Sequence, residues 1–316
     1  MEGLVLSVTN DYQLQNQFIS VNIEETLSDY LAQLDSSEAT KKTYTRCIKS
    51  FIAWLKQQER NTADYQAIMT YKNYLYAKNY SVRTVNTHIT AIKSLYSYLE
   101  SLGYRNSAKR VKRDRTAKTF KRQCLTQSQV KDIYSSIDTS TIEGARNNAI
   151  IRLMLGTALR ICEVVRADIE DIKTNGNTQI LMVKGKGEKE KGTPVILSPS
   201  VINALQEYFK MRGDIKGNEP LFTSLSDRNK GQRLTTRTVQ NIVKGLYKQN
   251  GIISKDITAH STRHTAITQA ILHGATVPQA QAMARHKDIN TTMIYYHDID
   301  RLENNAESIL ESVYNS

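Results

Sequence analysis

The sequence predicts a mainly α-helical protein of two domains, an all-helical domain followed by a mostly helical domain that contains a small antiparallel β-sheet. Three observations predict this. The chain has 316 residues, which corresponds to about two domains of ordinary size. Apolar residues recur every three or four positions over most of its length, as amphipathic helices require. One region, around residues 178–197, instead alternates apolar and polar residues on both sides of a turn rich in glycine and lysine, which is typical of a β-hairpin.

The helical patterns have recognisable ends. Ser37 and Ser81 precede two of them, and a serine hydroxyl at this position can accept the unpaired backbone N–H groups of a first helical turn. Gly103 is placed to end the helix that begins after Ser81. The first stretch of the chain is polar and shows only weak periodicity. The expected segments are a flexible arm (1–20), a helical domain (21–104), a basic linker (105–122), a second domain (123–300) and a C-terminal helix (301–316).

The charge of the chain indicates a polyanionic partner. The formal net charge is +12 and the pI is about 9.4, and nucleic acid is the commonest partner of such a chain. A generally basic surface is the alternative. The distribution favours nucleic acid, because residues 105–122 hold nine Lys or Arg and one Asp with almost no apolar residues. We expect this segment to contribute nothing to a core and to order along DNA phosphates.

Two helices of the first domain carry polar faces that suit a DNA groove. A solvated surface is the alternative for such faces. The aromatic residues of the same helices lie at core spacing, so we expect Phe51, Trp54 and Tyr96 to be buried. The residues assigned to DNA binding, on these faces and in the linker, are Lys41, Lys42, Arg46, Arg83, Thr84, Asn86, His88, Lys93, Arg110, Lys112, Arg113 and Arg115.

Several classes of protein are excluded. No run of about 18 apolar residues exists to span a membrane, and the first residues lack the pattern of a secretory signal, so we expect a cytoplasmic protein. Cys47, Cys124 and Cys162 lie far apart, which argues against a zinc finger or a disulfide framework and favours free, buried thiols. No metal and no cofactor are expected.

Some polar residues stand where a helical core would not need them. Arg160 and Glu163 lie in an apolar stretch, predicted to be a helix or helix pair broken near Gly156. A buried charge is costly unless it is paired or bound to a ligand. A structural ion pair between Arg160 and Glu163 is therefore the alternative to a functional site.

A second group of such residues follows later in the chain. His260 and Arg263 form an HxxR pattern, and we expect both to project from one helical face while His264 points elsewhere in a structural role. His286 is followed nine residues later by Tyr295. Metal binding is the rival for the histidines, but no metal-ligand spacing and few carboxylates accompany them.

Two Arg, one Lys and two His suit a phosphodiester. Arginine presents a fixed fork of donors to phosphate oxygens, and such donors gain strength as charge builds in the transition state. A tyrosine phenol can then act as the nucleophile, and a lysine in the hairpin turn can protonate the leaving oxygen. Composition alone leaves Tyr295 and Tyr296 open as nucleophiles. It also leaves three lysines open for the turn, namely Lys184, Lys186 and Lys189.

The ordered set of motifs resembles the tyrosine recombinase family of Xer proteins, phage integrases and Cre. The set comprises ALRxxE at Arg160, GKG at Lys186, HxxR at His260 and Arg263, His286, and Tyr295. The stretches SEATKKTYTRCIKSFIAWL and YSVRTVNTHITAIKSLYSYL resemble helices of the family's SAM-like core-binding domain, so the similarity covers about residues 22–300. One departure is Arg285, which stands where the family has glycine before the histidine.

The resemblance implies a role for each matching residue. Arg160 and Arg263 would hold the scissile phosphate, Glu163 would buttress the site, and His286 would hydrogen-bond the phosphate. His260 would assist proton handling and Lys186, chosen by the GKG match, would protonate the leaving 5′-oxygen. The family spacing selects Tyr295, which would attack to form a 3′-phosphotyrosyl link without metal or ATP.

The resemblance also implies partners. These are double-stranded DNA with inverted-repeat core sites, four protomers on two sites, and accessory DNA-bending or directionality proteins, in a prokaryotic nucleoid, phage or mobile element. The helix of residues 301–316 would dock on a neighbouring protomer, with packing on its own domain as the alternative. A type IB topoisomerase and a catalytically inert DNA-binding protein are the rival functions.

Overall fold

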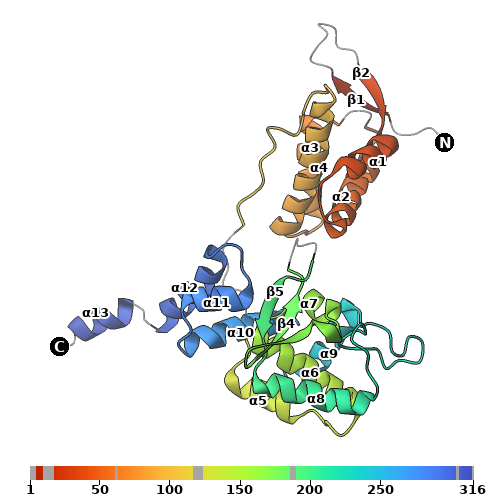
Figure 1. The fold of residues 1–316 in the computed structure, drawn as a ribbon. Helices are drawn as coiled ribbons and strands as arrows, with labels where there is room; N and C mark the ends of the chain where they lie inside the picture. The colour runs from red at the N-terminus through yellow and green to blue at the C-terminus, as the bar shows by residue number, and fades with distance from the viewer. Residues whose placement is uncertain are drawn as a thin grey trace. The chain divides into compact units, whose positions relative to one another are not determined.

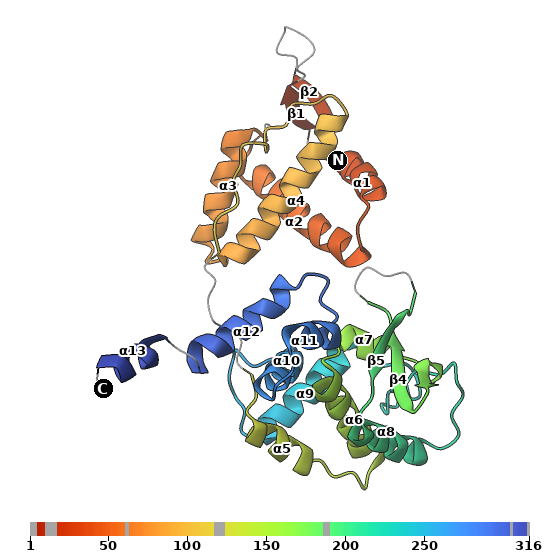
Figure 2. The same cartoon turned by 60° about the vertical axis from the view of Figure 1, so that its left-hand side comes forward.

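The structure is a computed structural model that describes residues 5–9, 18–60, 63–116, 124–185, 190–303 and 306–314. It divides into two compact units, residues 1–119 and 120–316 (Figures 1 and 2). Both units are mostly helical, and the second contains a small antiparallel sheet, as predicted. No helix in the described part of the chain is both long and apolar enough to cross a membrane.

The amino-terminal unit contains the expected helices. Ser37 Oγ accepts the backbone N–H of Thr40 at 3.3 Å, and Ser81 Oγ accepts that of Thr84 at 3.2 Å, so both predicted N-caps are confirmed. Gly103 follows the last helix with a φ of +87°, the left-handed conformation typical of a helix end. The helices are α1 (Ile23–Gln33), α2 (Glu38–Gln57), α3 (Tyr65–Ala77) and α4 (Val82–Ser101).

The expected flexible arm contains regular structure. Strand β1 (Val5–Thr9) pairs antiparallel with β2 (Phe18–Asn22), with Val5 opposite Asn22 and Thr9 opposite Phe18. These strands were not predicted from the sequence. Both segments are rich in β-branched residues, which favour strands, and this local signal was outweighed by the polar residues around them.

Aromatic side chains form part of the core of the amino-terminal unit. Phe51, Trp54 and Tyr96 are buried there, as expected, and the Trp54 ring lies 5.3 Å from that of Tyr71. Ala108 and Val111 also belong to this core. The expectation that the basic segment contributes nothing to a core is thus wrong for its first part.

The second unit is built around α6, against which both α8 and α10 pack. The predicted hairpin is confirmed as β4 and β5, and a third strand, β3, extends it in the order β3-β4-β5. Helices α10, α11 and α12 contact one another and gather together in Figure 2. The helices are α5 (Gln127–Ser135), α6 (Ile142–Thr157), α7 (Ile161–Arg166), α8 (Pro199–Arg212), α9 (Thr236–Gln249), α10 (Ser261–Leu272), α11 (Val277–Ala284), α12 (Asn290–Glu303) and α13 (Ala306–Tyr314), and the strands are β3 (Ile172–Asn175), β4 (Thr178–Val183) and β5 (Thr193–Ile196).

Candidate active site

Arg160 lies at a break between two helices. Helix α6 ends at Thr157 and is followed by its C-cap Ala158, whose φ of 53° and ψ of 28° are left-handed, and Arg160 is the N-cap of α7. The predicted helix pair is confirmed, but the expectation that Arg160 lies inside an apolar helix is wrong. Its backbone N–H donates to Glu163 Oε2 at 2.7 Å and its Nη1 donates to Oε1 at 2.8 Å. The ion pair considered as an alternative is therefore present, with the Glu163 side chain only 1% exposed.

Arg263 joins the ends of two helices. It lies in α10 and is almost completely buried, as a charged residue can be only with partners. Nη1 donates to the carbonyl of Ala158 at 2.5 Å, and Nη2 donates to that of Ala284, the last residue of α11. Burial, followed by the nearby charges of Arg160 and Arg285, lowers the pKa of Arg263 to about 10.

Arg285 belongs to the same cluster. Its Nη2 donates to Glu163 Oε2 at 3.1 Å and to the carbonyl of Ala158 at 3.2 Å. Burial is the main cause that lowers its pKa, and the Glu163 carboxylate opposes this shift. We name Arg160, Glu163, Arg263 and Arg285 the arginine cluster. The cluster holds three cations and one carboxylate, which pairs with Arg160 and Arg285. This excess of positive charge suits an anionic ligand.

The histidines contact Tyr295 in an unexpected way. His264 Nδ1 forms a hydrogen bond with the Tyr295 hydroxyl, so the expectation that His264 points elsewhere is wrong. His260 is the N-cap of α10, and its ring lies edge-on to that of His264 with 4.7 Å between centroids. Positions four apart on a helix share a face just as positions three apart do. The four-residue spacing of His260 and His264 therefore also predicts that their side chains lie on one face of the helix.

His286 lies on the other side of Tyr295. The two rings are nearly parallel, at 20°, with centroids 6.2 Å apart. His286 Nδ1 forms a hydrogen bond of 2.9 Å with Thr292 Oγ1, a side chain fully buried at the start of α12. This bond fixes the orientation of the imidazole beside the phenol.

The two adjacent tyrosines differ sharply in environment. Tyr295 is 6% exposed and packs with α10 and α11, within electrostatic reach of Arg263. Tyr296 is 40% exposed, and its ring contacts that of His297. The structure thus gathers Tyr295, His264, His286 and Arg263 together, while Tyr296 turns to the surface.

The hairpin lysines are only partly described. Lys186 and Lys189 lie outside the described residues, and Lys184 is half-buried at the end of β4. Lys191, which the sequence analysis did not consider, is paired at 2.6 Å with both Asp168 and Asp171. This pairing fixes the chain where it enters β5.

Two further expectations concern cysteine and metal. Cys47 is buried, as expected, whereas Cys124 and Cys162 are half-buried, so the expectation of burial is wrong for these two. Cys124 Sγ lies 3.2 Å from Thr268 Oγ1. Among the residues that the structure describes, no group of three or more His, Cys, Asp or Glu side chains is arranged to hold a metal ion.

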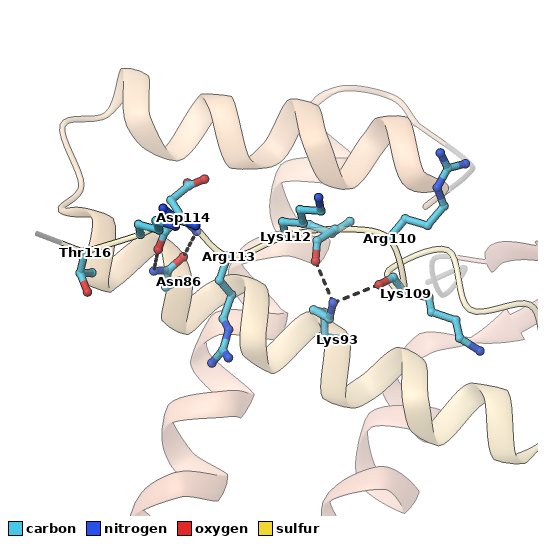
Figure 3. A pocket seen from close by; sticks show the side chains of 10 residues that line it. Asn86, Lys93, Lys109, Arg110, Lys112, Arg113, Asp114 and Thr116 are labelled. Carbon is cyan, nitrogen blue, oxygen red and sulfur yellow. Dashed lines mark hydrogen bonds between the residues drawn. The ribbon is translucent and has the colours of Figure 1, made fainter. Parts of the chain in front are cut away.

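Residues 109–116, which we name the basic strap, run along α4 in the amino-terminal unit (Figure 3). Lys93 Nζ donates to the carbonyls of Lys109 and Val111, at 3.2 and 2.7 Å. Asn86 exchanges two hydrogen bonds with the backbone of Asp114, at 2.8 and 2.9 Å. Figure 3 shows these contacts on the strap backbone, with Arg110 and Arg113 pointing to different sides of the strap.

The strap has a second fastening through its one carboxylate. Asp114 Oδ1 accepts from Lys72 Nζ at 2.7 Å, and its Oδ2 accepts from the Tyr76 hydroxyl. These hydrogen bonds lower the pKa of Asp114.

Among the residues assigned to DNA binding, those of the strap are exposed, as are Lys42, Arg46 and Arg83. Lys41 and Thr84 are half-buried, and His88 is buried with its Nδ1 2.9 Å from the Tyr71 hydroxyl.

Two family models match the chain. Residues 123–301 match the phage integrase family, and residues 24–105 match the N-terminal SAM-like domain of phage integrases. The chain therefore belongs to the phage integrase family, and site-specific DNA recombination is the function that this membership supports.

Curated relatives and solved structures agree with this assignment. A tyrosine recombinase of Synechocystis is 29% identical over 301 residues, covering 90% of this chain and 92% of the relative. Tyrosine recombinase XerD of Listeria monocytogenes is 28% identical over 286 residues, covering 87% and 93%. The fold is similar to XerH bound to palindromic difH, with a TM-score of 0.70 at 19% identity, covering 96% of this chain and 92% of that one. It is also similar to the Tn1549 transposon integrase with transposon-end DNA, with a TM-score of 0.69 at 18% identity over 92% and 98% of the two chains.

Proposed function

We propose that this chain cuts and rejoins duplex DNA at specific sites through a 3′-phosphotyrosyl link at Tyr295, without metal or ATP. The observation that carries the proposal is the Tyr295 hydroxyl, which is hydrogen-bonded to His264 near a cluster of three arginines, two of which pair with Glu163. A phenol next to a base is the arrangement of an activated nucleophile. A cationic site is what a phosphodiester requires.

The proposed step is a transesterification. Tyr295 Oη attacks the scissile phosphorus, and its proton passes to His264 Nδ1, the group to which it is hydrogen-bonded. Arg160 and Arg263 donate to the non-bridging oxygens as their charge grows, with His286 beside them. The bond to the 5′-oxygen then breaks, and Lys186 supplies the proton that this oxygen takes up. Reversal by another 5′-hydroxyl joins the new strand, and the phosphotyrosyl ester retains the bond energy.

The test uses a DNA site that the protein itself selects from randomised duplexes, which we call the selected site. A nick beside the cleavage position lets the short 5′-hydroxyl strand leave, so the covalent adduct accumulates. Tyr295→Phe should bind the selected site as well as the wild type and form no adduct, whereas Tyr296→Phe should form it. Loss of the adduct in Tyr296→Phe alone would assign the nucleophile to Tyr296.

The rival functions give different results. A type IB topoisomerase relaxes supercoiled plasmid that lacks the selected site, and an inert DNA-binding protein forms no adduct at all. Strand exchange between two selected sites in the presence of a chelator supports the proposal. Loss of adduct formation on addition of a chelator would show that a metal is needed.

We propose the basic strap as a phosphate-binding surface of the amino-terminal unit. Its lysines and arginines are exposed while its backbone is fastened to α4, which suits a segment that follows a DNA backbone. We include Lys42, Arg46 and Arg83 and leave out His88, which is buried. Asn86 and Lys93 serve this surface by holding the strap.

We further propose that four protomers act on two inverted-repeat sites inside a prokaryotic cell, with accessory proteins that bend DNA or set direction. Helix α13 would dock on a neighbouring protomer, since Leu310, Val313 and Tyr314 are exposed on it. Deletion of residues 301–316 should then weaken synapsis of two sites and leave binding to one site unchanged. Equal loss of both would contradict trans docking.

A further inference from the structure

Arg285 has an unfavourable backbone conformation for an arginine. It is the C-cap of α11, with a φ of 53° and a ψ of 45°. This left-handed region favours glycine, because a side chain meets the following carbonyl there. The Arg285 Nε is also buried without a hydrogen-bond partner among the residues that the structure describes. Both features are unfavourable, so the contacts of the guanidinium have to offset them.

Those contacts are concentrated on the end of α6 and on Glu163. Nη1 donates to the carbonyl of Met283 at 2.7 Å and to that of Thr157, the last residue of α6, at 3.4 Å. Nη2 donates to the carbonyl of Ala158 at 3.2 Å and to Glu163 Oε2 at 3.1 Å. The Ala158 carbonyl also accepts from Arg263 Nη1. One side chain, itself 8% exposed, thus touches partners of both Arg160 and Arg263.

The contact with Glu163 determines how Arg160 is held. Arginine and a carboxylate often pair through two parallel hydrogen bonds, which would occupy much of the guanidinium. Here Glu163 Oε2 accepts from the Arg160 backbone N–H and from Arg285, so among the residues that the structure describes the Arg160 guanidinium donates to Oε1 alone. The Arg160 side chain remains 24% exposed and lines a pocket together with His260 and Lys244. Its other N–H groups are thereby left for a ligand.

We propose that Arg285 is a positioning residue for DNA cleavage, which holds Glu163 and the end of α6 so that Arg160 keeps its fork of donors for the scissile phosphate. This inference rests on the proposed strand-transfer function. It assigns a role to a position at which the sequence departs from the family motif. After burial, the charges of Arg160 and Arg285 also lower the pKa of Arg263, so the three cations repel one another. An anion that enters the cluster relieves this repulsion.

The first experiment compares rate with binding. Adduct formation is measured in a single turnover on the nicked selected site at saturating DNA, together with the Kd and the thermal midpoint. Arg285→Gly, which relieves the backbone conformation, should lower the rate about ten- to hundredfold and change the Kd by less than about twofold. Arg285→Lys keeps the charge but not the planar fork of donors, so its rate of adduct formation should lie between those of the wild type and Arg285→Gly. Arg228→Gly removes an exposed arginine from a loop of the same unit and should leave the rate unchanged.

The second experiment asks whether Arg285 acts through Glu163. Glu163→Gln should slow adduct formation, and adding Arg285→Gly should slow it no further, because both changes release the same group. Additive losses would show that Arg285 acts on the phosphate by itself and would overturn the proposal. A lower thermal midpoint with an unchanged rate would also overturn it, by reducing Arg285 to a cap of α6.

These outcomes separate the inference from the proposed function. If the wild type forms no adduct, the strand-transfer function fails. If the wild type forms the adduct at Tyr295 and Arg285→Gly forms it at the same rate, only the role of Arg285 fails.

Discussion

The arginine cluster and the basic strap both concentrate positive charge, but they do so in opposite ways. In the cluster Arg263 and Arg285 are buried and Arg160 is half-buried, and the guanidinium groups are fixed by helix-end carbonyls and by Glu163. In the strap the backbone is fixed, by Lys93, Asn86 and Lys72, while the strap's own lysines and arginines stay in water. The cluster thus fixes the charged groups themselves, and the strap fixes only the backbone that carries them.

This difference matches two demands of the proposed reaction. Stabilising a transition state at one phosphorus needs preorganised donors, whose burial is tolerable only because each cation has partners. Following a DNA backbone needs many hydrated cations, each contributing modestly and in a salt-dependent way. Substitutions in the cluster should therefore change the rate of cleavage, and substitutions in the strap should change affinity.

The largest effect is expected for Arg263→Lys. The compact ammonium lacks the planar fork whose two Nη atoms reach the carbonyls of Ala158 and Ala284 while other N–H groups are left for a phosphate. Adduct formation on the selected site should fall about 10²- to 10³-fold, the loss typical of one preorganised donor, with the Kd changed less than about threefold. Single-turnover kinetics and fluorescence anisotropy measure the two quantities.

A matched control for Arg263→Lys is Arg212→Lys. The Arg212 side chain is only 9% exposed and donates to the carbonyl of Pro220 at 2.7 Å, but it pairs with Glu219 and lies outside the arginine cluster. This variant should lower the thermal midpoint without changing the cleavage rate. Equal slowing in both variants would mean that the rate reports only general stability.

The next effect concerns Asp168, a carboxylate in the second unit. It pairs with two cations, as Asp114 pairs with Lys72 in the amino-terminal unit. Asp168 pairs with Lys191 at 2.6 Å and with Arg233. Burial raises its pKa, but the hydrogen bonds from these two cations outweigh burial and lower it below the usual 3.8. A lowered pKa in the folded state stabilises the fold above pH 3.8, and this stabilisation disappears as the pH falls through the folded value.

Asp168→Asn should therefore lower the free energy of unfolding of the second unit at pH 7 by about 1–3 kcal/mol. The difference from wild type should shrink steadily below about pH 4, because the wild-type carboxylate is then protonated. Calorimetry at pH 7 and at pH 3 checks both statements. A difference that grows with acid would mean that the carboxylate is not held in its charged form.

The two regions also differ in how far the sequence predicted them. Caps such as Ser37 and Ser81 were predictable because they depend on residues within one turn. The place of Arg160 was not, because the helix break depends on Ala158, a residue with no local reason to adopt a left-handed conformation. The contact of His264 with Tyr295 arises only when α10 packs on α12.

For the strap, the sequence predicted the charged side chains correctly and the packing of the backbone incorrectly. Its composition predicted exposure correctly for the lysines and arginines. It could not reveal that Val111 reaches the core, because the hydrogen bonds that hold the strap come from Lys72, Asn86 and Lys93, at least 16 positions away in the sequence. Charge composition thus predicts what a segment binds better than it predicts where the segment packs.

A smaller effect, on DNA affinity, is expected for Asp114→Asn, and its direction separates two roles of the carboxylate. Removing a negative charge beside phosphates should by itself tighten DNA binding. Because Asp114 fastens the strap to Lys72 and Tyr76, we expect the opposite, a three- to tenfold weaker affinity, or about 1 kcal/mol, from the cost of ordering a loosened chain. Asp35→Asn makes the same charge change at an exposed position and should not weaken binding. Tighter binding by Asp114→Asn would show that its charge outweighs its hold on the strap.

The smallest effect separates the two regions most directly, through salt. Each phosphate contact by a lysine or arginine contributes about 0.9 to the slope of log K against log salt. Arg113→Ala should therefore reduce this slope by about one and weaken binding to all sequences alike. Arg263→Lys should leave the slope unchanged, because its charge is retained and its effect lies in the transition state. If both variants changed the slope equally, the buried cluster would be contributing to affinity in the same way as the strap, and the division of labour between them would not hold.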